Sequence, residues 1–218
     1  MFALVESGSI TQMPKGNKGI TLNNVQYPPS IYTLWNESER NAIGIYTVEI
    51  DDTNKKDDEW YINTNITYAF GSGKVTGTYG TATAKKIADT LYTQDDVDKD
   101  VYPDDYSITS KRGKRIHTFA KDDVKTKGLK TIKKELINNQ CEGLLAPSDW
   151  RVVKATETGG TMDSGWKTWR ASLRTKCNSM QTQITNASDV DALAALFTYT
   201  TNADGDTTRQ LGEFPVKE

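Results

Sequence analysis

The chain has 218 residues, and its 27 basic and 29 acidic side chains leave a formal net charge of −2, so no overall positive field attracts nucleic acid. The mean hydropathy is −0.64, and no apolar run is long enough to span a membrane. The sequence opens without the basic and apolar stretches of a secretory signal, so we expect a protein made in a cytoplasm. A change of character midway along the chain predicts two small domains.

Residues 1–83 are predicted to form a small antiparallel β-rich domain, so that the whole chain belongs to the α+β class. β-branched and aromatic residues gather in several segments, some with the alternation of a half-buried strand. These segments are Phe2 to Val5, Ile43 to Ile50, Trp60 to Phe70 and Lys74 to Tyr79. Asp51 to Asp58 is expected to be a charged turn within an antiparallel meander. Helical spacing between Ile31 and Ala42 predicts one short helix.

Gly71-Ser72-Gly73 is predicted to be a hairpin turn between the last two strands. The same stretch is superficially similar to a phosphate-binding loop, because Gly73 is followed by Lys74. Such a loop needs Ser or Thr after the lysine and then a helix, whose N-terminus binds the phosphate. Here Val75 and a predicted strand follow, so the hairpin turn is the favoured interpretation.

Residues 84–118 are interpreted as a charged connector. Six aspartates between Asp95 and Asp105 precede a basic cluster from Lys111 to Arg115. No aromatic residue interleaves the basic cluster, which disfavours binding to bases and leaves phosphate or lipid binding as an alternative. The aspartates fit no ligand spacing, so no metal site is predicted there, although metal binding stays open. His117 is the only histidine, and no nucleophile elbow is present, so no catalytic residue and no cofactor are predicted.

Residues 119–218 are predicted to form a module of two or three helices. The first helix is expected from about Asp122 to Glu142, with Gly128 inside it and Gly143 as its stop. Its apolar stripe comprises Val124, Leu129, Ile132, Leu136 and then Ile137 or Cys141. The stretch from Asp149 to Val153 is expected to be a short extended segment.

The clearest predicted helix carries apolar residues at heptad spacing. They are Trp166, Trp169, Leu173, Cys177, Met180 and Ile184. We expect this stripe to be buried on another helix or on the same stripe of a neighbouring subunit. Ser188 to Asp191 predicts a capped third helix after it.

The two cysteines, Cys141 and Cys177, lie at apolar positions of predicted helices and lack metal-ligand spacing. Two buried free thiols are favoured over a disulfide bridge between the helices. The stretch from Asn202 to Asp206 is similar to the middle of a calcium-binding loop. Thr200 and Leu211 stand where that loop needs acidic ligands, so a polar turn is predicted instead.

The run Leu144-Leu145-Ala146-Pro147-Ser148-Asp149-Trp150, followed by Trp166, Trp169, Arg170, Leu173 and Arg174, resembles the C-terminal module of bacteriophage tail and tail-fibre assembly proteins. The resemblance extends from about Leu129 to about Phe197. The opening residues Met1 to Val5 also resemble the start of such proteins. Family members often finish on Trp-Pro, whereas this chain finishes on Glu213 to Glu218.

The resemblance implies a non-enzymatic structural or adaptor component of the virion tail, at the tail fibre or baseplate, assembled in the host cytoplasm. Its partners would be other tail subunits, and the chain would be a homo-oligomer or be bound to an oligomer. A transient assembly chaperone is the alternative, and a virion glycan-binding protein or hydrolase is a rival of another class.

The candidate interface residues are Trp150, Trp166, Trp169, Arg170 and Arg174. Aromatic residues and arginine are enriched at protein interfaces and at their hot spots. For Trp166 and Trp169, packing inside the module is the favoured alternative, whereas Trp150 is the better candidate for a partner's surface.

Overall fold

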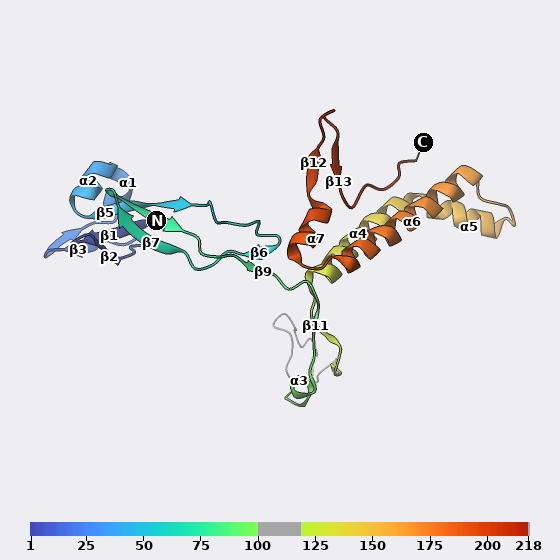
Figure 1. The fold of residues 1–218 in the computed structure, drawn as a ribbon, viewed down its shortest axis with the longest axis horizontal. Coiled ribbons are helices and arrows are strands. Elements are labelled where there is room, and N and C mark those ends of the chain that lie inside the picture. The colour runs from blue at the N-terminus through green and yellow to red at the C-terminus, as the bar shows by residue number, and fades with distance from the viewer. Residues whose placement is uncertain (100–118, 218) are drawn as a thin grey trace. The chain divides into compact units, whose positions relative to one another are not determined.

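The computed structural model describes residues 1–99 and 119–217 and divides the chain into two compact units, Met1–Ala84 and Lys85–Glu218 (Figure 1). The first unit contains a mixed β-sheet and short helices. The second is built around the helices α4 (Leu129–Leu145), α6 (Ser164–Asn186) and α7 (Val190–Phe197). The expected α+β class, with a β-rich first part and a helical last part, is confirmed.

The sheet of the first unit has five strands and is a nearly closed barrel. In spatial order they are β2 (Ser9–Gln12), β1 (Phe2–Glu6), β5 (Ile45–Asp51), β8 (Lys74–Thr78) and β7 (Thr67–Gly71). The pair β5–β8 is parallel, and the other neighbours are antiparallel. The predicted antiparallel meander is therefore wrong at the β5–β8 pair. In the hairpin formed by β7 and β8, the second strand, β8, is the one that pairs with β5. That strand carries the fully buried Val75, whereas β7 has no buried residue.

The hairpin turn between β7 and β8 is confirmed. Ser72 and Gly73 have φ values of 52° and 75°, and Gly71 pairs with Lys74. Positive φ at both central positions matches the right-handed twist of the flanking strands. The glycine-rich stretch therefore joins two strands and does not precede a helix.

The predicted strand from Trp60 to Phe70 is interrupted. Only β6 (Tyr61–Ile62) forms before β7, and β6 pairs with β9 (Thr83–Ala84) in a separate small sheet. Asn65 has a φ of 62°, a conformation that a regular strand does not adopt. A further hairpin consists of β3 (Ile20–Leu22) and β4 (Val25–Tyr27).

The predicted helix from Ile31 to Ala42 forms as two short helices, α1 (Ile31–Leu34) and α2 (Glu37–Ala42). Asn36 separates them, because its side chain accepts a hydrogen bond from the Glu39 N–H and Glu39 bonds back to its N–H. This reciprocal cap starts a new helix at Glu37. Helix α1 contributes Ile31 and Tyr32 to a core cluster with residues of β1, β3 and β5, namely Leu4, Ile20, Leu22 and Ile45.

The second unit begins with a small antiparallel ladder between β10 (Thr90–Leu91) and β11 (Val124–Thr126), with α3 (Gln94–Asp98) between them in the chain. Tyr92 is buried and stacks on Phe119 at 4.8 Å between ring centroids. The described part of the predicted connector thus contains folded elements. Its remainder, residues 100–118 with the basic cluster and His117, lies outside the described residues.

The first long helix, α4 (Leu129–Leu145), differs from the prediction at both ends and in its buried face. Gly128 precedes the helix and donates its N–H to Asp89, and Gly143 lies inside the helix. The buried residues are Leu129, Lys133, Ile137 and Cys141, whereas Ile132 and Leu136 are exposed. Within the predicted stripe, Leu129, Ile137 and Cys141 are therefore confirmed and Ile132 and Leu136 are wrong, because Lys133 was not counted as a core position. Its aliphatic stem makes burial possible.

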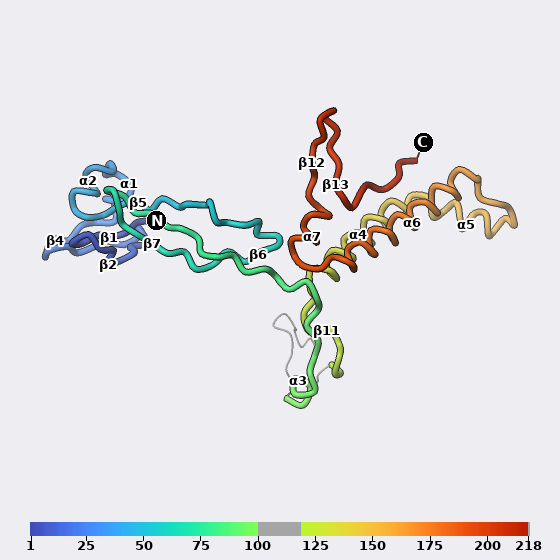
Figure 2. Tube along the Cα trace, in the orientation of Figure 1, coloured from blue at the N-terminus to red at the C-terminus, as the bar shows by residue number. Residues whose placement is uncertain are grey.

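Helix α4 continues through a 3₁₀ turn, η1 (Ala146–Ser148), into α5 (Asp149–Glu157). The extended segment predicted from Asp149 to Val153 is therefore wrong. Helix α6 (Ser164–Asn186) then runs beside α4 (Figures 1 and 2). As predicted, Leu173, Cys177, Met180 and Ile184 are buried.

Helix α7 (Val190–Phe197) begins at the predicted cap, where the Asp189 side chain accepts a hydrogen bond from the Ala192 N–H at 2.8 Å. It buries Val190, Leu193 and Leu196. The hairpin β12 (Tyr199–Thr201) and β13 (Thr207–Arg209) follows. Its turn is the polar segment Asn202 to Asp206, as predicted, and the Asn202 side chain accepts hydrogen bonds from two backbone N–H groups of the turn. Within residues 1–99 and 119–217, every helix is too short or too polar to cross a membrane.

Two glycines of the α4 region provide a matched test of this packing. A Cβ at Gly128 would collide with the backbone of Ala88, whereas a Cβ at Gly143 would meet nothing within 4 Å. We expect Gly128→Ala to lower the free energy of unfolding by about 1 to 3 kcal/mol through overpacking. Gly143→Ala should raise it by roughly 0.5 to 1 kcal/mol through helix propensity. Urea unfolding followed by circular dichroism measures both, and equal effects would contradict the described start of α4.

Candidate protein-interaction surface

Arg170 of α6 lies at the junction of the motif described above. The residue is 5% exposed, and its Nη1 donates to the carbonyl of Leu145 at 2.8 Å and to the hydroxyl of Ser148. Nη2 donates to the carboxylate of Asp149. A buried guanidinium is tolerated only when hydrogen bonds and a counter-charge replace its hydration. Arg170 therefore ties the end of α4, the η1 turn and the start of α5 to α6.

An aromatic and cationic stack lies beside this junction. The Arg151 guanidinium lies 4.6 Å from the ring centroid of Trp150 and 4.4 Å from that of Trp166. Trp166 in turn meets Trp169 edge to face at 5.5 Å. Such cation–π and aromatic contacts typically contribute about 0.5 to 1.5 kcal/mol each. The stack therefore holds Trp150 in a defined position although its ring is 53% exposed.

The expectation that Trp166 and Trp169 are buried in the heptad stripe is wrong. Both are half-buried, and the buried stripe of α6 begins at Arg170. Arg170 bonds the carbonyl of Leu145, the last residue of α4, so the residues of α6 that precede Arg170 lie at the edge of the α4–α6 contact. They are covered in part by α5 and by the segment Glu213–Lys217. The Trp169 indole N–H donates to the Pro215 carbonyl at 3.0 Å.

The structure brings four of the five candidate residues together: Trp150, Trp166, Trp169 and Arg170. Arg174 is exposed on α6, and the hydrogen bonds and ring contacts just described do not include it. Sequence reasoning missed Arg151 and Pro215. Their neighbours, Trp166 and Trp169, are distant in sequence, so only the adjacency of Arg151 to Trp150 was a visible signal.

Exposed aliphatic residues extend this surface. On α5, Val152 is 42% exposed and Val153 is 53% exposed. Leu144, close to the end of α4, is 41% exposed. Lys154 lies near the Trp150 ring at 5.9 Å, and Lys217 near the Trp166 ring at 5.6 Å. The surface thus combines a large aromatic ring, aliphatic groups and cations.

Two described aspartates of the predicted connector pair with lysines, whereas Asp98 accepts a hydrogen bond from the Gln94 side chain and Asp89 accepts from the Gly128 N–H and the Thr131 hydroxyl. Asp95 pairs with Lys99 at 2.8 Å, and Asp96 pairs with Lys125. Lys125 and the N–H and hydroxyl of Thr93 hold the pKa of Asp96 at about 2. Within residues 1–99 and 119–217, no group of three or more His, Cys, Asp or Glu side chains could hold a metal ion. Asp100, Asp104 and Asp105 lie outside the described residues.

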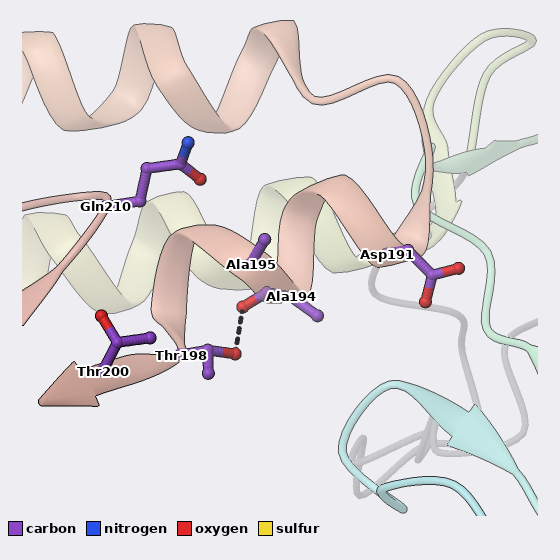
Figure 3. A pocket seen from close by; sticks show the side chains of 6 residues that line it. All are labelled: Asp191, Ala194, Ala195, Thr198, Thr200 and Gln210. Carbon is purple, nitrogen blue, oxygen red and sulfur yellow. Dashed lines mark hydrogen bonds between the residues drawn. The ribbon is translucent and has the colours of Figure 1, made fainter.

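A hollow of about 490 Å³ lies beside α7, lined by Asp191, Ala194, Ala195, Thr198, Thr200 and Gln210 (Figure 3). Asp191 is the one acidic or basic side chain in this lining, and Figure 3 shows Gln210 at the opposite end from it. The Thr198 hydroxyl donates to the carbonyl of Ala194 at 3.0 Å. The lining therefore lacks a converging set of polar groups that could bind or activate a substrate.

The chain matches no protein-family model, and no curated protein and no solved structure matches it either.

Arg170 and Arg174 are a matched pair for testing the junction. Arg170→Met removes the hydrogen bonds to Leu145, Ser148 and Asp149, and hydrogen bonds to charged groups contribute about 1.5 to 3 kcal/mol. We expect it to lower the free energy of unfolding by about 2 to 4 kcal/mol, whereas Arg174→Met at an exposed position should change it by less than about 0.5 kcal/mol. Denaturant titration gives both values. If the two variants lowered the free energy of unfolding equally, the hydrogen bonds of Arg170 would not stabilise the junction.

The cysteines provide a second test. Cys141 and Cys177 are buried free thiols, as predicted, and burial, together with the neighbouring Cys177, raises the pKa of Cys141 to about 11. A raised pKa lowers the thiolate fraction, which at pH 8 is then about one in a thousand for Cys141. We expect iodoacetamide to leave Cys141 unlabelled at pH 8 in the native protein and to label it fully in 6 M guanidinium. Fast native labelling, measured by mass spectrometry, would contradict the closed α4–α6 contact.

Proposed function

We propose that this chain is a non-enzymatic bacteriophage tail protein that mediates protein–protein contacts at the tail fibre or baseplate, as a structural or adaptor component of the virion. The observation that carries the proposal is the Arg170 junction. It joins the two halves of the motif, Leu144 to Trp150 and Trp166 to Arg174, into one unit of structure. The two segments of the motif stabilise each other, and this supports the proposal that the chain shares the architecture of the proteins that the motif resembles.

The chemistry of the surface supports protein recognition. Trp150 is exposed and held in place by Arg151, and both residue types are enriched at interface hot spots. A side chain that is already ordered loses little conformational entropy on binding. Exposed Val152 and Val153 provide apolar area around the tryptophan. The polar groups next to Trp150 are used in internal contacts, which favours a binding role over a catalytic one.

The proposed partners are other tail or tail-fibre subunits, and the chain acts as a homo-oligomer or bound to an oligomeric partner in the virion, after assembly in the host cytoplasm. Symmetric tail structures allow each copy to use the same patch without forming open filaments. A transient assembly chaperone is the alternative form of the proposal. The two differ in whether the chain stays in the finished particle.

Site-specific photo-crosslinking tests the proposal in the phage itself. A p-benzoylphenylalanine in place of Trp150 should crosslink to a tail protein in purified particles. The same residue in place of Thr182, exposed on α6 well away from the stack, should give no such crosslink. Mass spectrometry identifies the partner and its copy number.

Two other results would decide against the virion component. Crosslinks that form in infected cells, with the chain absent from finished particles, would establish the chaperone. Equal crosslinking from positions 150 and 182, together with binding of host glycans by the purified chain, would replace protein recognition with glycan binding.

A further inference from the structure

The guanidinium of Arg151 is held by two aromatic rings, but its N–H groups have no acceptor. It lies 4.6 Å from the ring centroid of Trp150 and 4.4 Å from that of Trp166. Within the described part of the chain, Arg151 forms no hydrogen bond and no ion pair. Stacking uses the flat face of a guanidinium and leaves the N–H groups, which lie in its plane, available. Arg151 is therefore a positioned hydrogen-bond donor that lacks an acceptor.

A small hollow lies beside this guanidinium. Its volume is about 190 Å³. The polar and aromatic residues of its lining are Trp150, Arg151, Lys154, Thr158, Thr161 and Asp163. Sites for drug-sized molecules typically have volumes of about 300 to 1,000 Å³. The hollow is therefore smaller than such a site and suits a single side chain or a small ion.

Positive charge exceeds negative charge around the hollow. Lys154, one helical turn after Trp150, lies 5.9 Å from the centroid of its ring and forms no ion pair with any described residue. Asp163 supplies the negative charge of the lining, and its Oδ1 accepts a hydrogen bond from the Trp166 N–H at 3.2 Å as the cap of α6. The Arg151 and Lys154 cations together outweigh this carboxylate, so the hollow favours an anionic group.

We propose that the hollow binds a carboxylate of a partner protein, the side chain of an aspartate or a glutamate, next to the exposed ring of Trp150. This inference rests on the proposed role of the Trp150 surface in protein recognition. The fork of an arginine matches a carboxylate with two parallel hydrogen bonds, and Lys154 adds a second cation. Val153, on the same face of α5 as Trp150, is 53% exposed. A partner that covers this apolar area also excludes water from the ion pair and so strengthens it.

A peptide titration of the purified full chain, followed by heteronuclear NMR, tests the carboxylate site without a phage. The probe is an acetylated and amidated peptide of alternating glycine and glutamate, and the control peptide has glutamine in place of glutamate. The glutamate peptide should shift the indole N–H signal of Trp150 and the Nε–H signal of Arg151. Its affinity should be at least about tenfold higher than that of the control peptide, and added salt should lower it.

Matched variants locate the site. Arg151→Lys keeps the charge but removes the fork, and it should weaken binding of the glutamate peptide by about tenfold. Arg174→Lys makes the same change at an exposed position of α6 and should leave the affinity unchanged. Lys154→Gln removes the second cation and should weaken binding by about two- to fivefold, which keeps a test available if Arg151→Lys disturbs the stack. Circular dichroism verifies that each variant is folded.

Three results would overturn the carboxylate site. They are the absence of a saturable shift at Trp150 and Arg151, an equal loss of affinity in Arg151→Lys and Arg174→Lys, and tighter binding of inorganic phosphate than of the glutamate peptide. The last result would assign the hollow to a free anion. All three leave the crosslinking test at Trp150 unaffected, so this inference can fail while the proposed function stands. Saturable peptide binding without a crosslink to a tail protein would support the site and contradict the proposed function.

Discussion

The helical unit depends on one buried cation. Arg170 is 5% exposed as a residue, so its guanidinium has lost nearly all of its hydration, and its position is stable only because a carbonyl, a hydroxyl and a carboxylate replace the water. All three acceptors come from one short stretch, Leu145 to Asp149. Arg170 therefore dictates where α4 ends, how the chain turns through η1 and where α5 begins. No other interaction described for this unit constrains three elements at once.

The junction also marks the change from core to surface along α6. On one side of Arg170, the seam from Leu173 to Ile184 packs on α4 and is dry enough to keep the pKa of the Cys141 thiol near 11. On the other side, at the edge of the α4–α6 contact, Trp166 contacts Arg151 of α5 and Trp169 bonds the Pro215 carbonyl. The residues of the heptad pattern are thus buried from Leu173 to Ile184 and half-exposed at Trp166 and Trp169.

This arrangement explains how an exposed tryptophan can remain ordered. Trp150 is held by the Arg151 guanidinium, which in turn stacks on Trp166, and Trp166 contacts Trp169. Each member restricts the next, so the entropy of ordering the ring is already lost before a partner arrives. The indole N–H of Trp169 is used separately, by the Pro215 carbonyl. Trp150 and Trp169 therefore lie at opposite ends of the same aromatic stack.

Local features were predictable from the sequence. The turn at Ser72 and Gly73, the cap at Asp189, the polar turn from Asn202 to Asp206 and the buried seam of α6 all follow from residues within a few positions of one another. Turn geometry, capping and helical periodicity act over that range. The α+β class followed from the same short-range signals. At the surface around Arg170, the motif pointed to Trp150, Trp166, Trp169 and Arg170, which lie together, but not to Arg151 or to the half-exposure of Trp166 and Trp169.

Tertiary structure alone decided the remainder. The parallel β5–β8 pair depends on which strand of a hairpin meets β5, and the buried face of α4 depends on the position of α6. Helix α5 is present where an extended segment was expected. Arg170 bonds Leu145, Ser148 and Asp149 at the same time, and these residues are close enough to do so only in a compact turn. Trp166 and Trp169 are half-exposed because they lie at the edge of the α4–α6 contact. Each of these outcomes arises from contacts between residues far apart in the chain, which periodicity along one segment cannot express.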